Sequence, residues 1–211
     1  MKHTVFIAIV SALIGFCTAS QANISVDPAG LTSADQTVDF ESVPLTQNDS
    51  VTNQFSSFGV AFTGAYGNPD LSSLLPNISG NRIGNFQSGI GESLLFTLDF
   101  ASDLGQAAFA LVTAEGTTTF QALLDGVVVE TASFVTSFTD SSNLFSFSNI
   151  VFDQIAIRVE SFDRAFLLDN LQMVAAVAAP VPEPETWALM LAGLWSVGEI
   201  ARRRRALRKQ R

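Results

Sequence analysis

The alternation of apolar and polar side chains along short segments is the feature that most constrains how this chain can fold. In residues 93–100, the side chains of Leu94, Phe96, Leu98 and Phe100 would all project from one face of an extended strand, because strand side chains alternate with a period of two. Such a strand needs an apolar layer against one face and tolerates water on the other. The pattern therefore favours a β-protein with a buried interior over a helical bundle.

The dipeptide Asp125-Gly126 is the strongest turn signal in the chain. It lies between apolar runs at residues 120–124 and 127–131, and this dipeptide favours the two-residue turn of a β-hairpin. The central part of the chain shows no long helical periodicity. We expect strands at residues 36–41, 58–63, 93–100, 106–113, 117–124, 127–131, 144–152, 154–160 and 165–173.

Sixteen of the 18 phenylalanines lie between residues 23 and 180. Short strands with many large apolar side chains predict an all-β fold, a single β-sandwich of jelly-roll type at residues 37–174. We interpret the phenylalanines as core residues rather than as a platform for a ligand. Residues 23–36 and 175–185 are expected to be linkers, and residues 64–92 a long loop.

The N-terminus has the organisation of a secretory signal peptide. Lys2 supplies a positive charge, residues 5–16 are largely apolar, and Ser20-Gln21-Ala22 ends in a small residue. We expect the secretion translocon to export the chain and a signal peptidase to cut after Ala22. Residues 1–22 would then be absent from the mature protein.

The C-terminus combines an extended segment, an apolar run and a basic end. Prolines at positions 180, 182 and 184 remove backbone donors and disfavour helix in the residues before them. We expect residues 186–201 to form a single transmembrane helix of about 24 Å, with the tail 202–211 on the cytoplasmic side. A buried helix and a nucleic-acid-binding arm are the alternatives for the apolar run and the basic end. The membrane stop would consist of Arg202, Arg203, Arg204 and Arg205.

The string VPEPETWALMLAGLWSVGEIARRRR, at residues 181–205, resembles the PEP-CTERM sorting signal of Gram-negative bacteria. That signal has a Val-Pro-Glu-Pro motif, a short transmembrane helix rich in Leu and Gly, and a terminal arginine cluster. The resemblance implies that an exosortase recognises the motif and removes the tail after a transient tether in the inner membrane. It also implies a final location at the cell surface or in the extracellular matrix, in association with exopolysaccharide and biofilm. The motif residues are Val181, Pro182, Glu183 and Pro184.

Charge and missing side chains exclude several classes of function. Seventeen acidic and three basic side chains between residues 23 and 180 give a formal charge of −14, which disfavours nucleic acid as a partner. Cys17 and His3, each the single residue of its type, lie in the predicted signal peptide, and the body has no lysine. Thiol and imidazole nucleophiles, Ser-His-Asp triads and His or Cys zinc sites are thereby excluded, whereas paired carboxylates are not.

Two acidic motifs lie near the ends of the predicted sandwich. Residues 38–41 read Val-Asp-Phe-Glu in the first expected strand, and residues 168–171 read Leu-Asp-Asn-Leu in the last. This arrangement resembles jelly-roll carbohydrate-binding modules and many PEP-CTERM bodies. The resemblance implies a structural Ca²⁺ bound by carboxylate oxygens of Asp39, Glu41 and Asp169. The alternative is that Asp39 and Glu41 face solvent and that Asp169 begins a turn.

The long loop at residues 64–92 contains a candidate ligand surface. Sugar-binding sites press aromatic faces against sugar rings and surround them with polar groups. Tyr66 is the one tyrosine of the chain, and Asn68, Asp70 and Arg82 follow it in the same loop. An ordinary solvated loop is the alternative.

These features lead to three hypotheses. The first is an exported, non-enzymatic surface or matrix protein associated with exopolysaccharide, in its sharper form a Ca²⁺-dependent carbohydrate-binding module. The second is a glycoside hydrolase or lyase that uses carboxylates. The third is a self-associating structural adhesin, suggested by a Ser/Thr/Phe-rich body whose expected strand edges carry few charges.

Overall fold

The computed structural model describes residues 23–69, 75–85, 95–161, 163, 165–177, 192, 193 and 195. The chain divides into two units, Met1–Ala176 and Val177–Arg211. The first unit is all-β and its described strands pair in antiparallel fashion throughout. The strands are β1 Asn23–Val26, β2 Gln36–Val38, β3 Ser50–Val51, β4 Val60–Thr63, β5 Ala65–Asn68, β6 Arg82–Gly84, β7 Leu95–Thr113, β8 Gly116–Leu124, β9 Val127–Thr136, β10 Leu144–Ser148, β11 Phe152–Ser161 and β12 Phe166–Ala175.

Strand β7 is long enough to belong to both halves of the sheet. Its first part pairs with β4 and β11, and its second part pairs with β10 and β12. Leu104 is the point of passage, because it is opposite Phe152 of β11 and also opposite Ala175 of β12. The sequence predicted two strands, at residues 93–100 and 106–113, with a break between them. That break is wrong: the exposed residues 101–103 lie where the strand passes from one half to the other, and the backbone N–H of Ala101 still donates to the carbonyl of Gly59.

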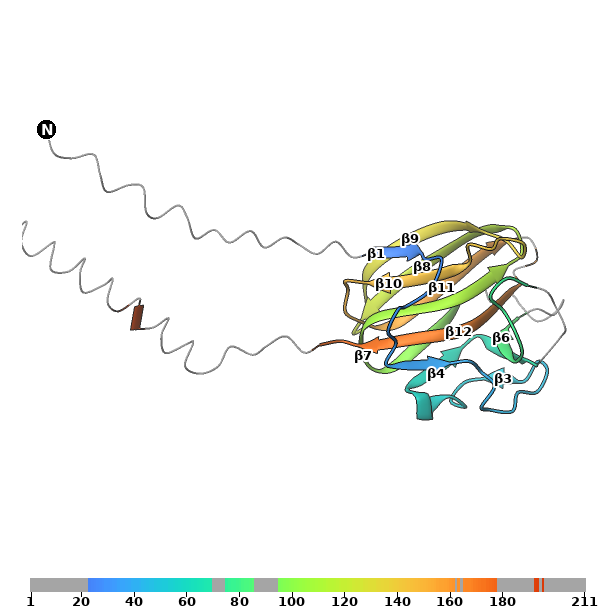
Figure 1. Cartoon of the computed structure of the whole chain (residues 1–211), viewed down its shortest axis with the longest axis horizontal. Coiled ribbons are helices and arrows are strands. Elements are labelled where there is room, and N and C mark those ends of the chain that lie inside the picture. Colours follow the sequence, from blue (N-terminus) through green and yellow to red (C-terminus); the bar gives the residue numbers. More distant parts are fainter. Residues whose placement is uncertain are drawn as a thin grey trace, which may run out of the picture. The chain divides into compact units, whose positions relative to one another are not determined.

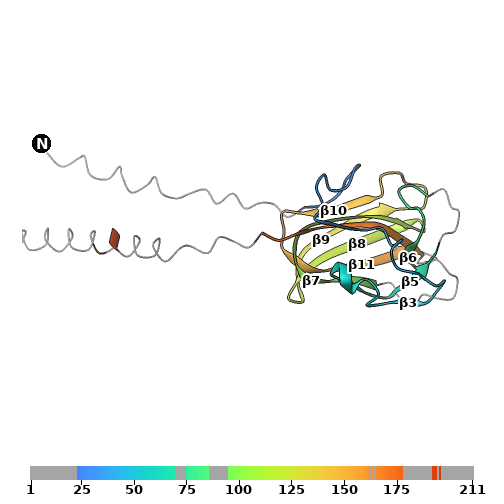
Figure 2. The ribbon, with the colours of Figure 1, turned by 60° about the horizontal axis from the view of Figure 1, so that its bottom comes forward.

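The continuous sheet folds over into two layers, as expected for a β-sandwich (Figures 1 and 2). One layer contains β4, the first part of β7, β11, β8 and β9. The other contains β1, β10, the second part of β7, β12, β2, β6, β5 and β3. Layers that share a strand cannot slide past each other independently, so the register of β7 fixes how their inner faces meet.

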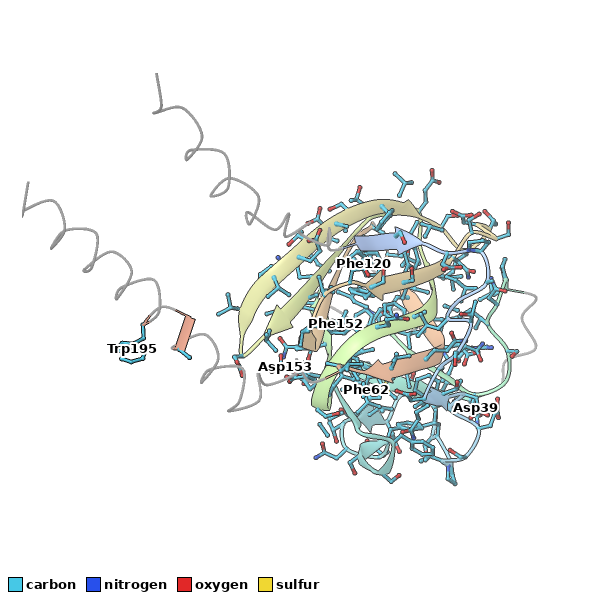
Figure 3. The ribbon with its side chains drawn as sticks, turned by 60° about the vertical axis from the view of Figure 1, so that its left-hand side comes forward. Asp39, Phe62, Phe120, Phe152, Asp153 and Trp195 are labelled. Atoms are coloured by element: carbon cyan, nitrogen blue, oxygen red, sulfur yellow. The ribbon has the colours of Figure 1, made fainter. Side chains whose placement is uncertain are left out.

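Phenylalanine side chains fill the space between the layers, as the sequence predicted. Phe120 of β8 is completely buried, and its ring lies 4.6 Å from that of Phe145 and 6.2 Å from that of Phe109, both in the other layer. Phe96 and Phe166 stack with their ring centroids 3.8 Å apart. Figure 3 shows Phe120 and Phe152 among the packed strands. Rings from both layers interdigitate, so the core depends on both layers being in place.

The β8–β9 hairpin is confirmed, and its turn has the backbone that the dipeptide demands. Asp125 and Gly126 have φ values of 51° and 75°, and two positive φ values are the requirement of a type I′ turn. Asp and Gly are among the few residues that adopt this conformation at low cost.

Several short strands lie where the sequence indicated linkers or loops. Residues 23–36, expected as a linker, contribute β1, which pairs with β10, and residues 64–92, expected as one long loop, contain β5 and β6. Strands of three or four residues are too short to produce a recognisable period-two pattern. Their pairing partners are distant in the sequence, which is why the local pattern missed them.

In the second unit, residues 192, 193 and 195 are helical. Over the described part of the chain, no helix combines the length and the apolar character needed to cross a membrane. The predicted transmembrane segment 186–201 lies largely outside the described residues.

We expect Phe120→Ala to lower the free energy of unfolding by about 3–5 kcal/mol, because it opens a cavity between the two layers. Val135→Ala on the adjacent strand β9 is the control, since Val135 is 76% exposed and its truncation should change stability by less than about 0.5 kcal/mol. Urea denaturation measures both. A loss at Phe120 no larger than the loss at Val135 would contradict the assigned core.

Candidate functional site

Two carboxylates from distant parts of the sequence hold the loop at residues 77–82. The Asp169 Oδ2 atom accepts a hydrogen bond of 2.9 Å from the backbone N–H of Ser79, and the Glu41 Oε1 atom accepts one of 2.7 Å from the backbone N–H of Asn81. Asp169 belongs to β12, and Glu41 follows β2. The loop is therefore anchored at two points, each by a charge-assisted hydrogen bond.

Strand pairing brings these acids to the same place. Val38, the last residue of β2, is opposite Leu171 of β12, so the chain that leaves β2 passes close to Asp169. Phe40 has a φ of 61° and a completely buried side chain. This left-handed residue, costly for a bulky side chain, lets Phe40 enter the core while Asp39 and Glu41 stay exposed.

An irregularity in β12 sets the direction of Asp169. The register of β12 against β7 shifts between Asp169 and Gln172, and Asn170 between them has a φ of 54°. β-Bulges of this kind bend a strand and redirect its side chains. The Asp169 Oδ1 atom also accepts a hydrogen bond of 2.7 Å from the Asn170 N–H, so both carboxylate oxygens have backbone donors.

Burial perturbs the acidity of Asp169. Its side chain is 1% exposed. Desolvation raises the pKa of Asp169 from 3.8 to about 6, and the charge of Glu41 acts in the same direction. The N–H groups of Ser79 and Asn170 and the charge of Arg82 oppose this rise. The carboxyl of Asp169 can therefore change protonation near neutral pH.

The residues expected to bind Ca²⁺ are brought together only in part. Glu41 and Asp169 hold the same loop, whereas Asp39 is exposed and its Oδ1 atom accepts the N–H of Glu41 in a local turn (Figure 3). Within the described ranges, no three His, Cys, Asp or Glu side chains converge as metal ligands. Ca²⁺ takes six to eight oxygen ligands, whereas both oxygens of Asp169 and one oxygen each of Asp39 and Glu41 already accept backbone N–H groups. The three carboxylates are therefore not assembled as one ligand set in the described part of the chain.

A shallow groove of about 390 Å³ lies beside the anchored loop. Its lining combines aliphatic side chains with amide and hydroxyl groups, and none of the lining residues is charged. The lining residues are Ala29, Leu75, Asn77, Ile78, Ser79, Leu144, Asn170 and Gln172. Ser79 belongs both to this groove and to the anchored loop, so the carboxylates fix one wall of the groove.

A network of amides holds the other polar groups of the groove in place. The Asn77 Nδ2 atom donates to Asn143 Oδ1 at 2.6 Å, and the Asn143 Nδ2 atom donates to the carbonyl of Pro76 at 2.6 Å. The Asn170 Nδ2 atom donates to the carbonyl of Asn77 at 3.2 Å, and Gln172 Oε1 accepts the N–H of Leu31 at 2.7 Å. These bonds preorganise the groove before any ligand arrives.

The sequence did not identify this groove. Asn77 and Asn170 have φ values of 55° and 54°, a conformation that asparagine tolerates better than most residues. An asparagine beside a turn was the one sequence signal for these residues, and it is weak because asparagine is common in loops. Asn77 and Asn170 form part of a site because they contact each other although they are 93 positions apart in the sequence.

The ligand surface expected around Tyr66 is not assembled as predicted. Asn68 and Arg82 are opposite each other in the β5–β6 ladder and are 2% and 1% exposed, so neither side chain is available on the surface. Tyr66 is half-buried in β5. The Arg82 Nη1 atom instead donates to the carbonyl of Gly80 at 3.4 Å. Asp70 lies outside the described residues.

The predicted processing sites also fall outside the described part of the chain. These are the cleavage residue Ala22, the motif residues Val181, Pro182, Glu183 and Pro184, and the arginines Arg202, Arg203, Arg204 and Arg205.

Comparisons with known proteins give distant structural likenesses. No protein-family model and no curated protein matches the chain. Among solved structures, the chain is similar to the CBM22-1–GH10 modules of xylanase 10B from Clostridium thermocellum, which were solved in complex with xylohexaose. The identity is 15% and the TM-score is 0.34, and the match covers 65% of this chain and 29% of that one. The Agl-KA catalytic domain matches at 14% identity and a TM-score of 0.34, over 73% and 31% of the two chains. CBM32-3 from a family 31 glycoside hydrolase of Clostridium perfringens matches at 8% identity and a TM-score of 0.32, over 66% and 95%.

This chain thus spans about three tenths of the xylanase and Agl-KA chains. Likenesses at these TM-scores carry no argument about function.

The raised pKa of Asp169 predicts how stability depends on pH. Between pH 3.8 and about 6 the folded state binds more protons at Asp169 than the unfolded state, so this group contributes stability that increases as the pH falls through that window. The change is on the order of 3 kcal/mol. Asp169→Asn lacks this titration. The measured quantity is the difference between the two unfolding free energies, that of the unsubstituted chain minus that of the variant, in the presence of chelator. We expect this difference to increase when the pH is lowered from 6.5 to 4. A difference that decreases over this range would contradict the assignment.

Proposed function

We propose that this protein is an exported, non-enzymatic β-sandwich of jelly-roll type that binds neutral saccharide chains of an extracellular matrix. The observation that carries the proposal is the uncharged groove of about 390 Å³, with aliphatic walls and preorganised amides, beside the anchored loop. Its volume is within the range of small-molecule sites. The proposal rests on the chemistry of the groove rather than on the distant likenesses.

The groove suits a sugar because a pyranose has both apolar and polar faces. The partly buried Leu75 and Leu144 offer apolar contact to the C–H face of a ring, and Asn77 and Asn170 offer amides to its hydroxyls. The surrounding body has a formal charge of −14, which repels acidic polysaccharides. A neutral saccharide is therefore the favoured ligand.

A carboxylate-based glycoside hydrolase or lyase is the second candidate. Asp169 is buried with a raised pKa, and the charge of Glu41 acts on it, which are features of catalytic acids. Against catalysis, both oxygens of Asp169 accept backbone N–H groups of the protein. This geometry supports a positioning role for Asp169, with its carboxylate holding the loop rather than a substrate.

Export and sorting complete the proposal. The string at residues 181–205 supports processing by an exosortase after transient tethering in the inner membrane, and the described sheet ends at Ala175, shortly before the motif. The processed body would then reach the surface or matrix, where exopolysaccharide is available. Structural Ca²⁺ at Asp39, Glu41 and Asp169 stays a prediction, and thermal unfolding with and without chelator would test it.

Mass spectrometry tests the processing. We expect the exported form to begin at Asn23 and to lack the tail beyond residues 181–184. The double variant Pro182→Ala, Pro184→Ala should retain the tail, because it loses the motif that the enzyme would recognise. Pro180→Ala, just outside the motif, should be processed normally. A full-length chain that stays in the cytosol would contradict this part of the proposal.

Calorimetric titration tests sugar binding, with glucose- and xylose-based hexasaccharides as probes and an oligogalacturonate as the charged counterpart. We expect Asn170→Gly to weaken neutral-sugar binding by about tenfold, because glycine keeps the left-handed backbone but removes one amide contact. Asn149→Gly is the matched control, since Asn149 has a φ of 57° and does not line the groove. Equal effects of the two variants, or no binding of any neutral probe, would contradict the proposal.

A further inference from the structure

Strand β9 is an open edge of the sheet. Nine of its ten residues have partners in β8 on one side, and among the described strands none pairs with the other side. The neighbouring edge of the other layer, β1, pairs with β10 instead. An unpaired strand edge presents backbone donors and acceptors that can continue a sheet.

The edge has few of the features that normally block such pairing. Glu130 is its single charged residue, and it contains no proline or lysine. Val127 and Val135 are 65% and 76% exposed. One irregularity, between Ala122 and Leu123 of β8, leaves Val129 of β9 without an opposite residue. Beyond that bulge, residues 130–136 pair one to one with residues of β8. The free side of this stretch is therefore a regular strand edge that another strand can join.

We propose that the β9 edge pairs with the β9 edge of a second copy, antiparallel about a two-fold axis centred on Ser133. A two-fold axis perpendicular to a sheet leaves each side chain on its own face of the sheet. Because side chains alternate between the faces along a strand, two residues that lie opposite each other must both have even numbers or both have odd numbers. The regular stretch 130–136 has Ser133 at its centre. This register places Thr131 opposite Val135 and Glu130 opposite Thr136.

The charges on the edge itself are compatible with a second copy as the occupant, provided that the repulsion between the two acidic bodies is screened. In the proposed register the glutamates of the two copies do not face each other, and cross-strand like charges are avoided. The two bodies, each with a formal charge of −14, still repel at longer range. Salt screens that repulsion, so self-association should strengthen as ionic strength rises. Binding to a basic partner would weaken instead.

Single cysteines test the register, because the only native cysteine, Cys17, can be replaced by serine. The full-length chain is solubilised in a nonionic detergent and oxidised with a copper catalyst in air. Ser133→Cys should form a disulfide-linked dimer, with more dimer in 0.5 M than in 0.05 M NaCl. Ser42→Cys is the control, since Ser42 is exposed but lies outside the strands.

A charged substitution on the edge gives the second readout. In the Ser133→Cys background, Val135→Lys should lower the yield of dimer by about tenfold, because desolvating an ammonium group at a strand pair is costly. Val151→Lys is the matched control, since Val151 is 42% exposed and lies before β11, and it should leave the yield within about twofold. Three results would overturn the proposal. They are equal dimer yields for Ser42→Cys and Ser133→Cys, a dimer yield that Val135→Lys does not change, and no dimer at either salt concentration.

Discussion

The packing of phenylalanine rings around one shared strand is the interaction on which the rest of this structure depends. β7 gives backbone partners to both layers and passes between them at Leu104. Rings from β8, β10 and β12 then meet across the interior, as in the contact between Phe120 and Phe145. Close-packed aromatic cores tolerate little displacement, so the positions of the outer strands follow from β7.

The candidate site is a consequence of that arrangement. β12 pairs with the second part of β7, and its bulge turns Asp169 toward the loop at residues 77–82. β2 pairs with β12 and delivers Glu41 to the same loop. The cost of burying Asp169 is visible in its raised pKa. That cost is offset in part by two backbone hydrogen bonds, and the one from the N–H of Ser79 also fixes that wall of the groove.

The sequence predicted those parts of the molecule that are determined by local patterns. The alternation in residues 93–100 and the Asp125-Gly126 turn led to the right fold class, and the acidic motifs led to Glu41 and Asp169. The Asn77–Asn170 contact was not predictable, because it depends on a register shift between β7 and β12. Asn68 and Arg82 were assigned to a surface loop because nothing local shows that β5 and β6 form a buried ladder.

The central functional claim is that the preorganised amides of the groove receive a neutral sugar. The most direct measurement is the response of the side-chain amide signals of Asn77, Asn170 and Gln172 in nuclear magnetic resonance spectra when a neutral hexasaccharide is added. These signals should shift together and saturate, while the amide of Asn48, which does not line the groove, stays in place. Unchanged groove signals with any shifts confined to other surfaces would contradict the assignment of this groove as the binding site.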